Sequence, residues 1–216
     1  MRFIIVGGGT FGRTLGENLA ESKHDVVLIE KEEKIAKEVA EDFNGKVING
    51  NGTEEDTLDD AGIDKSDFFV TTTGTDETNL LACMVAKGMS NIKLATRVTK
   101  EGYKKIFEEA GINIIVSPEI TGAEELEFMI TEPDVLTIAS THKGGVSLLE
   151  MKVESKSRIK GMKIGDIEED NTFRLVSIKR KDKFLIPTDE TKIEAGDSII
   201  VIAKKRHESK IMGLFK

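Results

Sequence analysis

The sequence predicts an α/β fold, a doubly wound parallel sheet, followed by a small α+β domain. Three observations carry this prediction: short apolar runs alternate with helical segments, a glycine-rich turn follows the first run, and the pattern changes near residue 132. Strand–helix–strand units of this kind build parallel sheets with right-handed crossovers and helices on both faces. We therefore expect one domain over residues 1–132 and a second over residues 133–216.

The expected elements of the first domain alternate strictly along the chain. Runs rich in β-branched residues, typical of strands, cover 3–6, 26–29, 46–48, 68–71, 92–95 and 112–116. Segments of helical periodicity or composition cover 11–20, 34–43, 54–61, 77–86 and 104–110. Gly62 and Gly111 directly follow two of these helices, at a position where glycine commonly ends a helix.

The second domain begins where Pro133 disfavours the continuation of a helical stretch over 123–131. Strands are expected at 135–139, 146–153, 173–179, 183–186 and 198–203. Short helical pieces are expected at 162–167 and 207–215. The turn signals at 187–189 and 196–197 separate the later strands.

The sharpest local motif is a G-x-G-x-x-G directly between the first strand and the first helix. In a Rossmann domain the first glycine permits the tight turn, the second lets the backbone approach a pyrophosphate, and the third lets helix and strand pack closely. The free N–H groups and the dipole of the helix then face the phosphates. The motif predicts a nucleotide-binding loop at Gly7, Gly8, Gly9, Thr10, Phe11 and Gly12.

An acidic residue at the end of the second strand completes this motif, because its carboxylate accepts hydrogen bonds from ribose hydroxyls. Glu30 lies there, 30 − 12 = 18 positions after Gly12. A carboxylate at the ribose repels the additional phosphate of NADP, so NAD(H), ADP or ATP is the expected ligand. Lys31 is more simply interpreted as a solvated lysine than as a group that offsets this repulsion.

Three further loops leave the carboxyl ends of strands, where ligands of open α/β sheets bind. Asn51 follows the third strand, in a run that either wraps the adenine or caps the next helix through Thr53. Thr73 and Gly74 follow the fourth strand and either approach a ribose or cap a helix. Arg97 follows the fifth strand, where a guanidinium pairs with phosphate. The structural and the functional interpretation stay open for each loop.

The composition excludes several classes of protein. The formal net charge of −8 argues against sequence-independent binding of nucleic acid, whose phosphates attract a basic surface. No apolar run approaches the ~20 residues of a membrane span and no signal peptide is recognisable, so a cytoplasmic location is expected. The single cysteine, Cys83, excludes an internal disulfide and lies in a run typical of a buried helix face.

The sequence offers no recognisable catalytic or metal centre. The three histidines are dispersed without a partner at metal-ligand spacing, and neither a G-x-S-x-G elbow nor a Walker-type loop occurs. The second domain carries no acid or base of the kind that would face a nicotinamide. A ligand-sensing protein is therefore favoured over an enzyme. A small NAD-dependent oxidoreductase and a free-standing nucleotide sensor are the alternatives.

An ordered series of short motifs runs through both expected domains. Its members are Phe3-Ile4-Ile5-Val6-Gly7-Gly8-Gly9, Val27-Leu28-Ile29-Glu30, Gly50-Asn51-Gly52-Thr53, Asp76-Glu77-Thr78-Asn79, Arg97-Val98, Val116-Ser117-Pro118-Glu119, Ser157-Arg158-Ile159-Lys160-Gly161-Met162, Val176-Ser177-Ile178-Lys179-Arg180 and the run 193–201. With these motifs the chain resembles the RCK regulators of potassium conductance, specifically the Trk/Ktr-type regulatory subunits of potassium uptake.

This resemblance implies nucleotide contacts at the glycine loop from Gly7 to Phe11 and at the residues Glu30, Asn51, Thr73, Gly74 and Arg97. Some family members carry an arginine within the glycine loop that reaches the γ-phosphate at a neighbouring subunit. Here Thr10 occupies that position, with Arg13 nearby, so NAD(H) is expected before ADP or ATP. Asn51 stands where the family more often has aspartate.

The resemblance also implies a mechanism, in which a ligand moves a hinge between paired Rossmann lobes. A ring of such lobes then acts on a separate Trk/Ktr-type potassium-translocating membrane subunit at the inner face of the membrane. The chain is accordingly expected to form a homo-oligomer. The segment 120–130 is either a contact between copies or part of the core of one chain.

Overall fold

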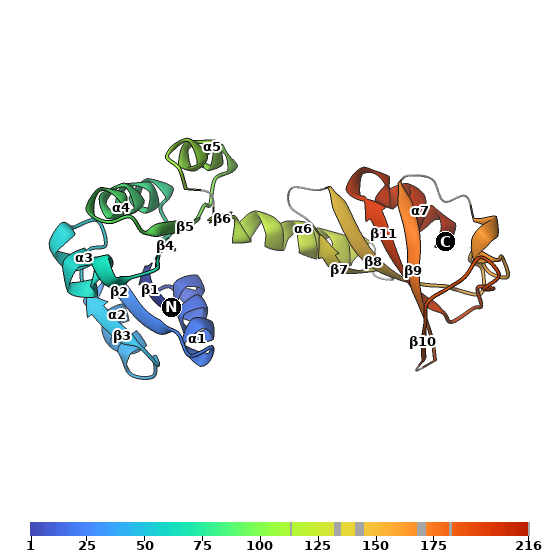
Figure 1. Cartoon of the computed structure of the whole chain (residues 1–216), viewed down its shortest axis with the longest axis horizontal. Helices are drawn as coiled ribbons and strands as arrows, with labels where there is room; N and C mark the ends of the chain where they lie inside the picture. The colour runs from blue at the N-terminus through green and yellow to red at the C-terminus, as the bar shows by residue number, and fades with distance from the viewer. Residues whose placement is uncertain (113, 132–134, 141–144, 168–171, 182, 216) are drawn as a thin grey trace. The chain divides into compact units, whose positions relative to one another are not determined.

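The computed structural model describes residues 1–112, 114–131, 135–140, 145–167, 172–181 and 183–215. It divides into two compact units, Met1–Ala123 and Glu124–Lys216. The expected break at 132–134 lies outside the described residues. The predicted fold class is confirmed, because one unit holds a parallel sheet flanked by helices and the other a small antiparallel sheet (Figure 1).

The first unit is built on a six-stranded parallel sheet in the order β3-β2-β1-β4-β5-β6. Its strands are β1 Arg2–Val6, β2 Asp25–Glu30, β3 Lys46–Asn49, β4 Phe68–Thr71, β5 Lys93–Arg97 and β6 Ile114–Val116. Its helices are α1 Thr10–Glu21, α2 Glu33–Ala40, α3 Glu55–Ala61, α4 Asp76–Met89 and α5 Glu101–Glu109, with a 3-10 turn η1 at Ile63–Lys65. The order reverses between β1 and β4, which is where open α/β sheets form their ligand crevice.

Both faces of this sheet are covered, because successive residues of a strand point to opposite sides. Ile4 and Val6 of β1 pack with α3, α4 and α5 in one apolar cluster. Ile5 between them packs with α1 and α2 in another. Cys83 of α4 is fully buried in the first cluster, which confirms its predicted place in the core.

Element ends differ from the sequence expectations where loops make their own hydrogen bonds. β6 begins at Ile114 instead of residue 112, because the amide of Ile112 bonds back to the carbonyl of Phe107 at the end of α5. Helix α6, Pro118–Thr131, begins five residues before the predicted 123. Proline suits the first turn of a helix, since the N–H that it lacks has no partner there.

The second unit contains a five-stranded antiparallel sheet in the order β10-β9-β11-β8-β7. The strands are β7 Val135–Ser140, β8 Val146–Lys152, β9 Phe173–Arg180, β10 Lys183–Leu185 and β11 Ser198–Lys204. Two 3-10 turns, η2 Ile164–Asp166 and η3 Lys205–His207, and the helix α7 Glu208–Phe215 complete it. Ile211, Met212 and Phe215 of α7 pack in the core that one face of the sheet supplies. In the described parts of the chain, no helix has the length and apolar character to cross a membrane.

Candidate functional site

The glycine loop lies between β1 and α1, and its three motif glycines differ in what surrounds them. Gly7 adopts a φ of 109°, which favours glycine. A Cβ on Gly12 would lie 2.0 Å from the carbonyl oxygen of Gly7 and 2.4 Å from the hydroxyl of Thr72, so only glycine lets α1 approach the strand this closely. A Cβ on Gly9 would meet no atom within 4 Å. The backbone of Gly9 therefore faces open space where a ligand can approach.

The start of α1 receives no help from side chains. Gly9 is its N-cap, no side-chain group caps it, and its first turn contains no acidic residue. The N–H groups of a first helical turn have no partner within the helix and carry a partial positive charge. The first turn of α1, which begins at Thr10 and Phe11, and the open backbone of Gly9 before it are together suited to hold a phosphate.

Glu30 ends β2 directly beside the loop and is buried. Its Oε2 accepts a hydrogen bond of 2.6 Å from the amide of Gly8, and its Oε1 accepts one of 2.8 Å from the amide of Glu32. A Cβ on Gly8 would lie 3.1 Å from the side chain of Glu30, so this glycine makes room for the carboxylate. An ionised carboxylate has about four acceptor positions, which leaves two for ribose hydroxyls.

The loop after β3 is organised by two asparagines. The side-chain Nδ2 of Asn49 donates to the backbone carbonyls of Glu30 and Lys31, and these bonds join the ends of β3 and β2. Asn51 accepts from the amide and the hydroxyl of Thr53 and donates to Glu54. Thr53 therefore does not cap the next helix as the sequence suggested, because α3 begins only at Glu55 and the Thr53 hydroxyl is bound to Asn51.

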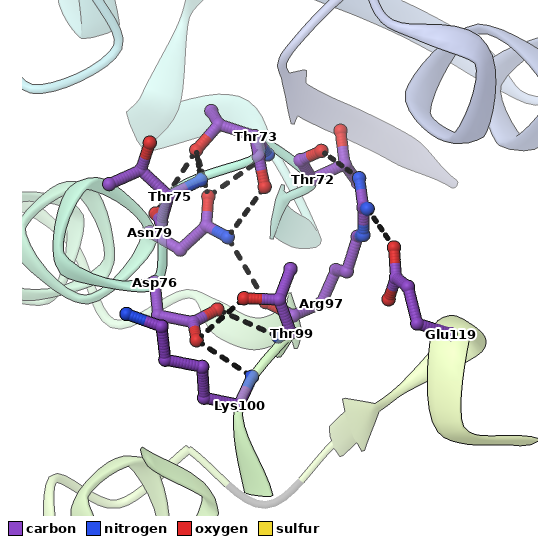
Figure 2. A network of polar contacts seen from close by, with 9 residues as sticks. All are labelled: Thr72, Thr73, Thr75, Asp76, Asn79, Arg97, Thr99, Lys100 and Glu119. Carbon is purple, nitrogen blue, oxygen red and sulfur yellow. Dashed lines mark hydrogen bonds and ion pairs between the residues drawn. The ribbon is translucent and has the colours of Figure 1, made fainter.

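The loops after β4 and β5 are held together by Asn79, which is fully buried on α4. Its Oδ1 accepts from the amide and hydroxyl of Thr73, and its Nδ2 donates to the carbonyls of Thr73 and Arg97 (Figure 2). Gly74, next in the loop, has open space at its Cβ position. Asn79 thus fixes the backbone of two residues that the sequence assigns to the site.

Asp76 makes a second connection between the same loops. It is buried at the start of α4, and its carboxylate accepts hydrogen bonds of 2.8 to 2.9 Å from the amide and hydroxyl of Thr99 and from the amide of Lys100 (Figure 2). The side chain of Asp76 thus links α4 to the loop after β5. No side-chain group caps α4 at Thr75.

Arg97 ends β5, and its guanidinium lies at the mouth of the glycine loop. Nη2 forms an ion pair with Glu119, the second residue of α6, while Nη1 lies 3.4 Å from the carbonyl oxygen of Thr72 (Figure 2). The guanidinium carbon lies 5.9 Å from the centre of the Phe11 ring. The hydrogen bond from Arg97 and the charge behind it hold the pKa of Glu119 below its usual value, despite partial desolvation.

Three further groups of the first unit were candidates for a chemical role: Arg13, possible metal ligands and the Cys83 thiol. Arg13, noted for its proximity to the loop, forms ion pairs with Glu17 and Asp42. Within the described ranges no group of three His, Cys, Asp or Glu residues could hold a metal ion. Burial raises the pKa of the Cys83 thiol to about 11, against a hydrogen bond with Thr71 that lowers it.

An apolar groove of about 300 Å³ continues from Arg97 along the α1 face of the sheet. Phe11, Leu15 and Leu19 of α1 form one wall, and β4, β5 and β6 form its floor. A larger hollow of about 610 Å³ lies at the opposite edge of the sheet, around Lys87 and Lys93, away from the glycine loop. The predicted residues thus share one edge of the sheet, and their contact with a ligand stays a prediction.

Two family models match the chain. Residues 3–118 match the TrkA-N domain and residues 148–216 match the TrkA-C domain. The Trk system potassium uptake protein TrkA homolog of Methanothermobacter thermautotrophicus is 36% identical over 204 residues, which is 94% of either chain. The homolog of Archaeoglobus fulgidus is 31% identical over 219 residues, and the chain spans only 50% of its length.

Solved structures share the fold at low sequence identity. The GsuK channel superimposes with a TM-score of 0.68 at 18% identity, covering 99% of this chain and 39% of the channel chain. The GsuK channel bound to NAD superimposes with a TM-score of 0.63 at 16% identity, covering 100% of this chain and 39% of that one. At these identities the likeness concerns the fold.

Proposed function

We infer that this chain, which belongs to the TrkA family, is a nucleotide-binding regulatory subunit of a Trk- or Ktr-type potassium uptake system. The observation that carries the proposal is the glycine loop, whose open backbone at Gly9 lies between a ribose-type acid, Glu30, and a cation, Arg97. The names of its relatives support the connection with potassium uptake.

The proposed ligand is an adenine nucleotide, NAD(H) in the first place, with ADP or ATP at the same site. The first turn of α1 would hold its phosphates, and Glu30 would accept hydrogen bonds from a ribose. Asn51, Thr73 and Gly74 would line the remaining edge. The GsuK structure described as bound to NAD supports a nucleotide in this fold.

In this proposal the chain has no turnover of its own and acts through population shift. A ligand that binds one conformation more tightly than another shifts the equilibrium by that difference in affinity. The proposed assembly is a homo-oligomer at the cytoplasmic face of the membrane, in contact with a separate potassium-translocating subunit. The apolar side chains on α6 support contacts between copies: Leu126, Met129 and Ile130 are 59%, 53% and 70% exposed.

Calorimetry of the purified chain with NAD, NADH, ADP and ATP tests the site directly. A ligand at about 100 times its dissociation constant raises the free energy of unfolding by roughly 2.7 kcal/mol, which is readily seen as a thermal shift. Gly9→Val should remove binding and leave the melting temperature without ligand nearly unchanged, because a side chain there meets no protein atom. If no nucleotide at millimolar concentration binds the wild-type chain, the proposal is wrong.

The regulatory part of the proposal needs a second experiment. The bound nucleotide should change the solution scattering of the oligomer, and it should change potassium flux when the subunit is reconstituted with a Trk-type pore. Gly9→Val serves as the control that assembles but does not respond. Steady oxidation of NADH by the isolated chain with a small carbonyl substrate would instead identify an oxidoreductase.

A further inference from the structure

Arg97 is placed where three parts of the first unit meet. Its side chain is 20% exposed, and it touches the loop after β4 through Thr72, the glycine loop through Phe11 and the start of α6 through Glu119. A phosphate bound at the glycine loop and the carboxylate of Glu119 would therefore both be within the reach of one guanidinium.

The donors of Arg97 are incompletely used. Among the described residues its Nε is buried without a hydrogen-bond partner, and the contact from Nη1 to Thr72 is long at 3.4 Å. The only described anion on the guanidinium is Glu119, whose side chain is 46% exposed. The paired N–H donors of a guanidinium match the acceptor oxygens of a phosphate, so a phosphate is a strong competitor for this position.

Glu119 is not an isolated surface acid. It is the second residue of α6, in the turn that the hydrogen bond from Thr121 to Ser117 closes. The same helix begins in the first unit and ends in the second, where Phe128 packs against the apolar core. A change at Glu119 is thus a change at the start of the segment that joins the two units.

We propose that the Arg97–Glu119 ion pair is a ligand-dependent contact: an anionic group of the bound nucleotide takes Arg97 from Glu119, so that the first turn of α6 responds to occupancy. The inference rests on the proposed function and adds the residue that senses the ligand. Since the phosphate and the carboxylate compete, each weakens the binding of the other to Arg97 by the same factor.

Calorimetry with AMP, ADP and ATP on the full chain separates this contact from the rest of the site. Glu119→Gln keeps the shape of the side chain and removes the competing charge, so it should raise the affinity for ADP or ATP relative to AMP by about fivefold, the upper range for a partly exposed pair. Glu125→Gln removes the same charge from the same helix. It should leave the ADP-to-AMP and ATP-to-AMP affinity ratios within about twofold of wild type.

Hydrogen exchange supplies a second measurement, which does not depend on affinity ratios. The nucleotide that gains affinity in Glu119→Gln should speed amide exchange over residues 119–123 in the wild-type chain. Glu119→Gln without ligand should already show this faster exchange. If Glu119→Gln shifts all three affinities equally, or if exchange over 119–123 ignores the ligand, the inference is overturned and nucleotide binding stands. If neither these three nucleotides nor NAD(H) binds, the proposed function falls as well.

Discussion

Glu30 uses both of its carboxylate oxygens on backbone amides, those of Gly8 and Glu32. The same buried carboxylate thus shapes the glycine loop and presents negative charge where a ribose is expected. At the residue scale, the position of this carboxylate explains why a side chain on Gly8, which is not one of the three motif glycines, would crowd Glu30. We therefore expect stability and ligand selection to be coupled at this one group.

Glu30→Gln should therefore change two measurements together. The affinity ratio of NAD to NADP should fall by at least about tenfold, because the charge that repels the additional phosphate is removed. The free energy of unfolding should fall by about 1–2 kcal/mol. The NH₂ group of glutamine cannot accept a hydrogen bond, so one of the two backbone amides loses its acceptor. Glu32→Gln, an exposed neighbour, is the control. Equal affinity of the wild-type chain for NAD and NADP would show that Glu30 does not lie at the ribose.

At the scale of elements, an ion-pair network in the second unit joins the turn before β11 to the end of β9. Arg180 donates hydrogen bonds of 2.8 Å to both carboxylate oxygens of Asp197, and it also bonds to Glu194 and the carbonyl of Lys192. Burial opposes the ionisation of Asp197, but the bonds from Arg180 and the amide of Glu194 outweigh it and lower its pKa. Gly196, at a φ of 89°, lets the turn close.

This network predicts a pH-dependent stability. Because the pKa of Asp197 is lower in the folded chain, its contribution is fully present above its unfolded pKa of about 4 and is lost as pH falls through the folded value. Asp197→Asn should lower the free energy of unfolding by about 2–3 kcal/mol at pH 7. Urea unfolding should show this difference shrinking below pH 4. Asp166→Asn, an exposed acid of the same unit, is the control, and an equal deficit at pH 3 and pH 7 would contradict the assignment.

At the scale of the whole molecule, helix α6 exposes several large apolar side chains. None of its residues is buried, and Leu126, Met129 and Ile130 lie at i, i+3 and i+4, which places them on one face of the helix. An apolar helix face of this kind is typical of contacts between subunits. This face of α6 therefore supports the proposal that copies of the chain associate through it.

Serine at all three positions should raise the dissociation constant of the oligomer by at least about a hundredfold, since each buried apolar side chain contributes about 1.5 kcal/mol or more. Sedimentation equilibrium measures this directly. Phe184→Ser removes a comparably exposed apolar side chain from β10 and should leave the assembly unchanged. An oligomer that survives the triple substitution would place the contact elsewhere.

The sequence by itself determined the alternation of strands and helices, the glycine loop and the acid at the end of β2. These features are local, because strand alternation and turn glycines depend on neighbouring residues. Even the distinct roles of Gly7, Gly9 and Gly12 follow from the order of strand, turn and helix. The lengths of α6 and β6 were less predictable, since their ends are set by hydrogen bonds that a loop makes with its neighbour.

Only the tertiary structure decided how the loops are connected. Asn79 and Asp76 were visible as part of one motif, but their partners Arg97 and Thr99 lie at and after the end of β5, which the sheet order places beside β4. Glu119 likewise meets Arg97 across 22 positions of chain. No local sequence pattern predicts such pairs. A parallel sheet brings the carboxyl ends of distant strands to one edge, and the order of the strands decides which side chains meet there.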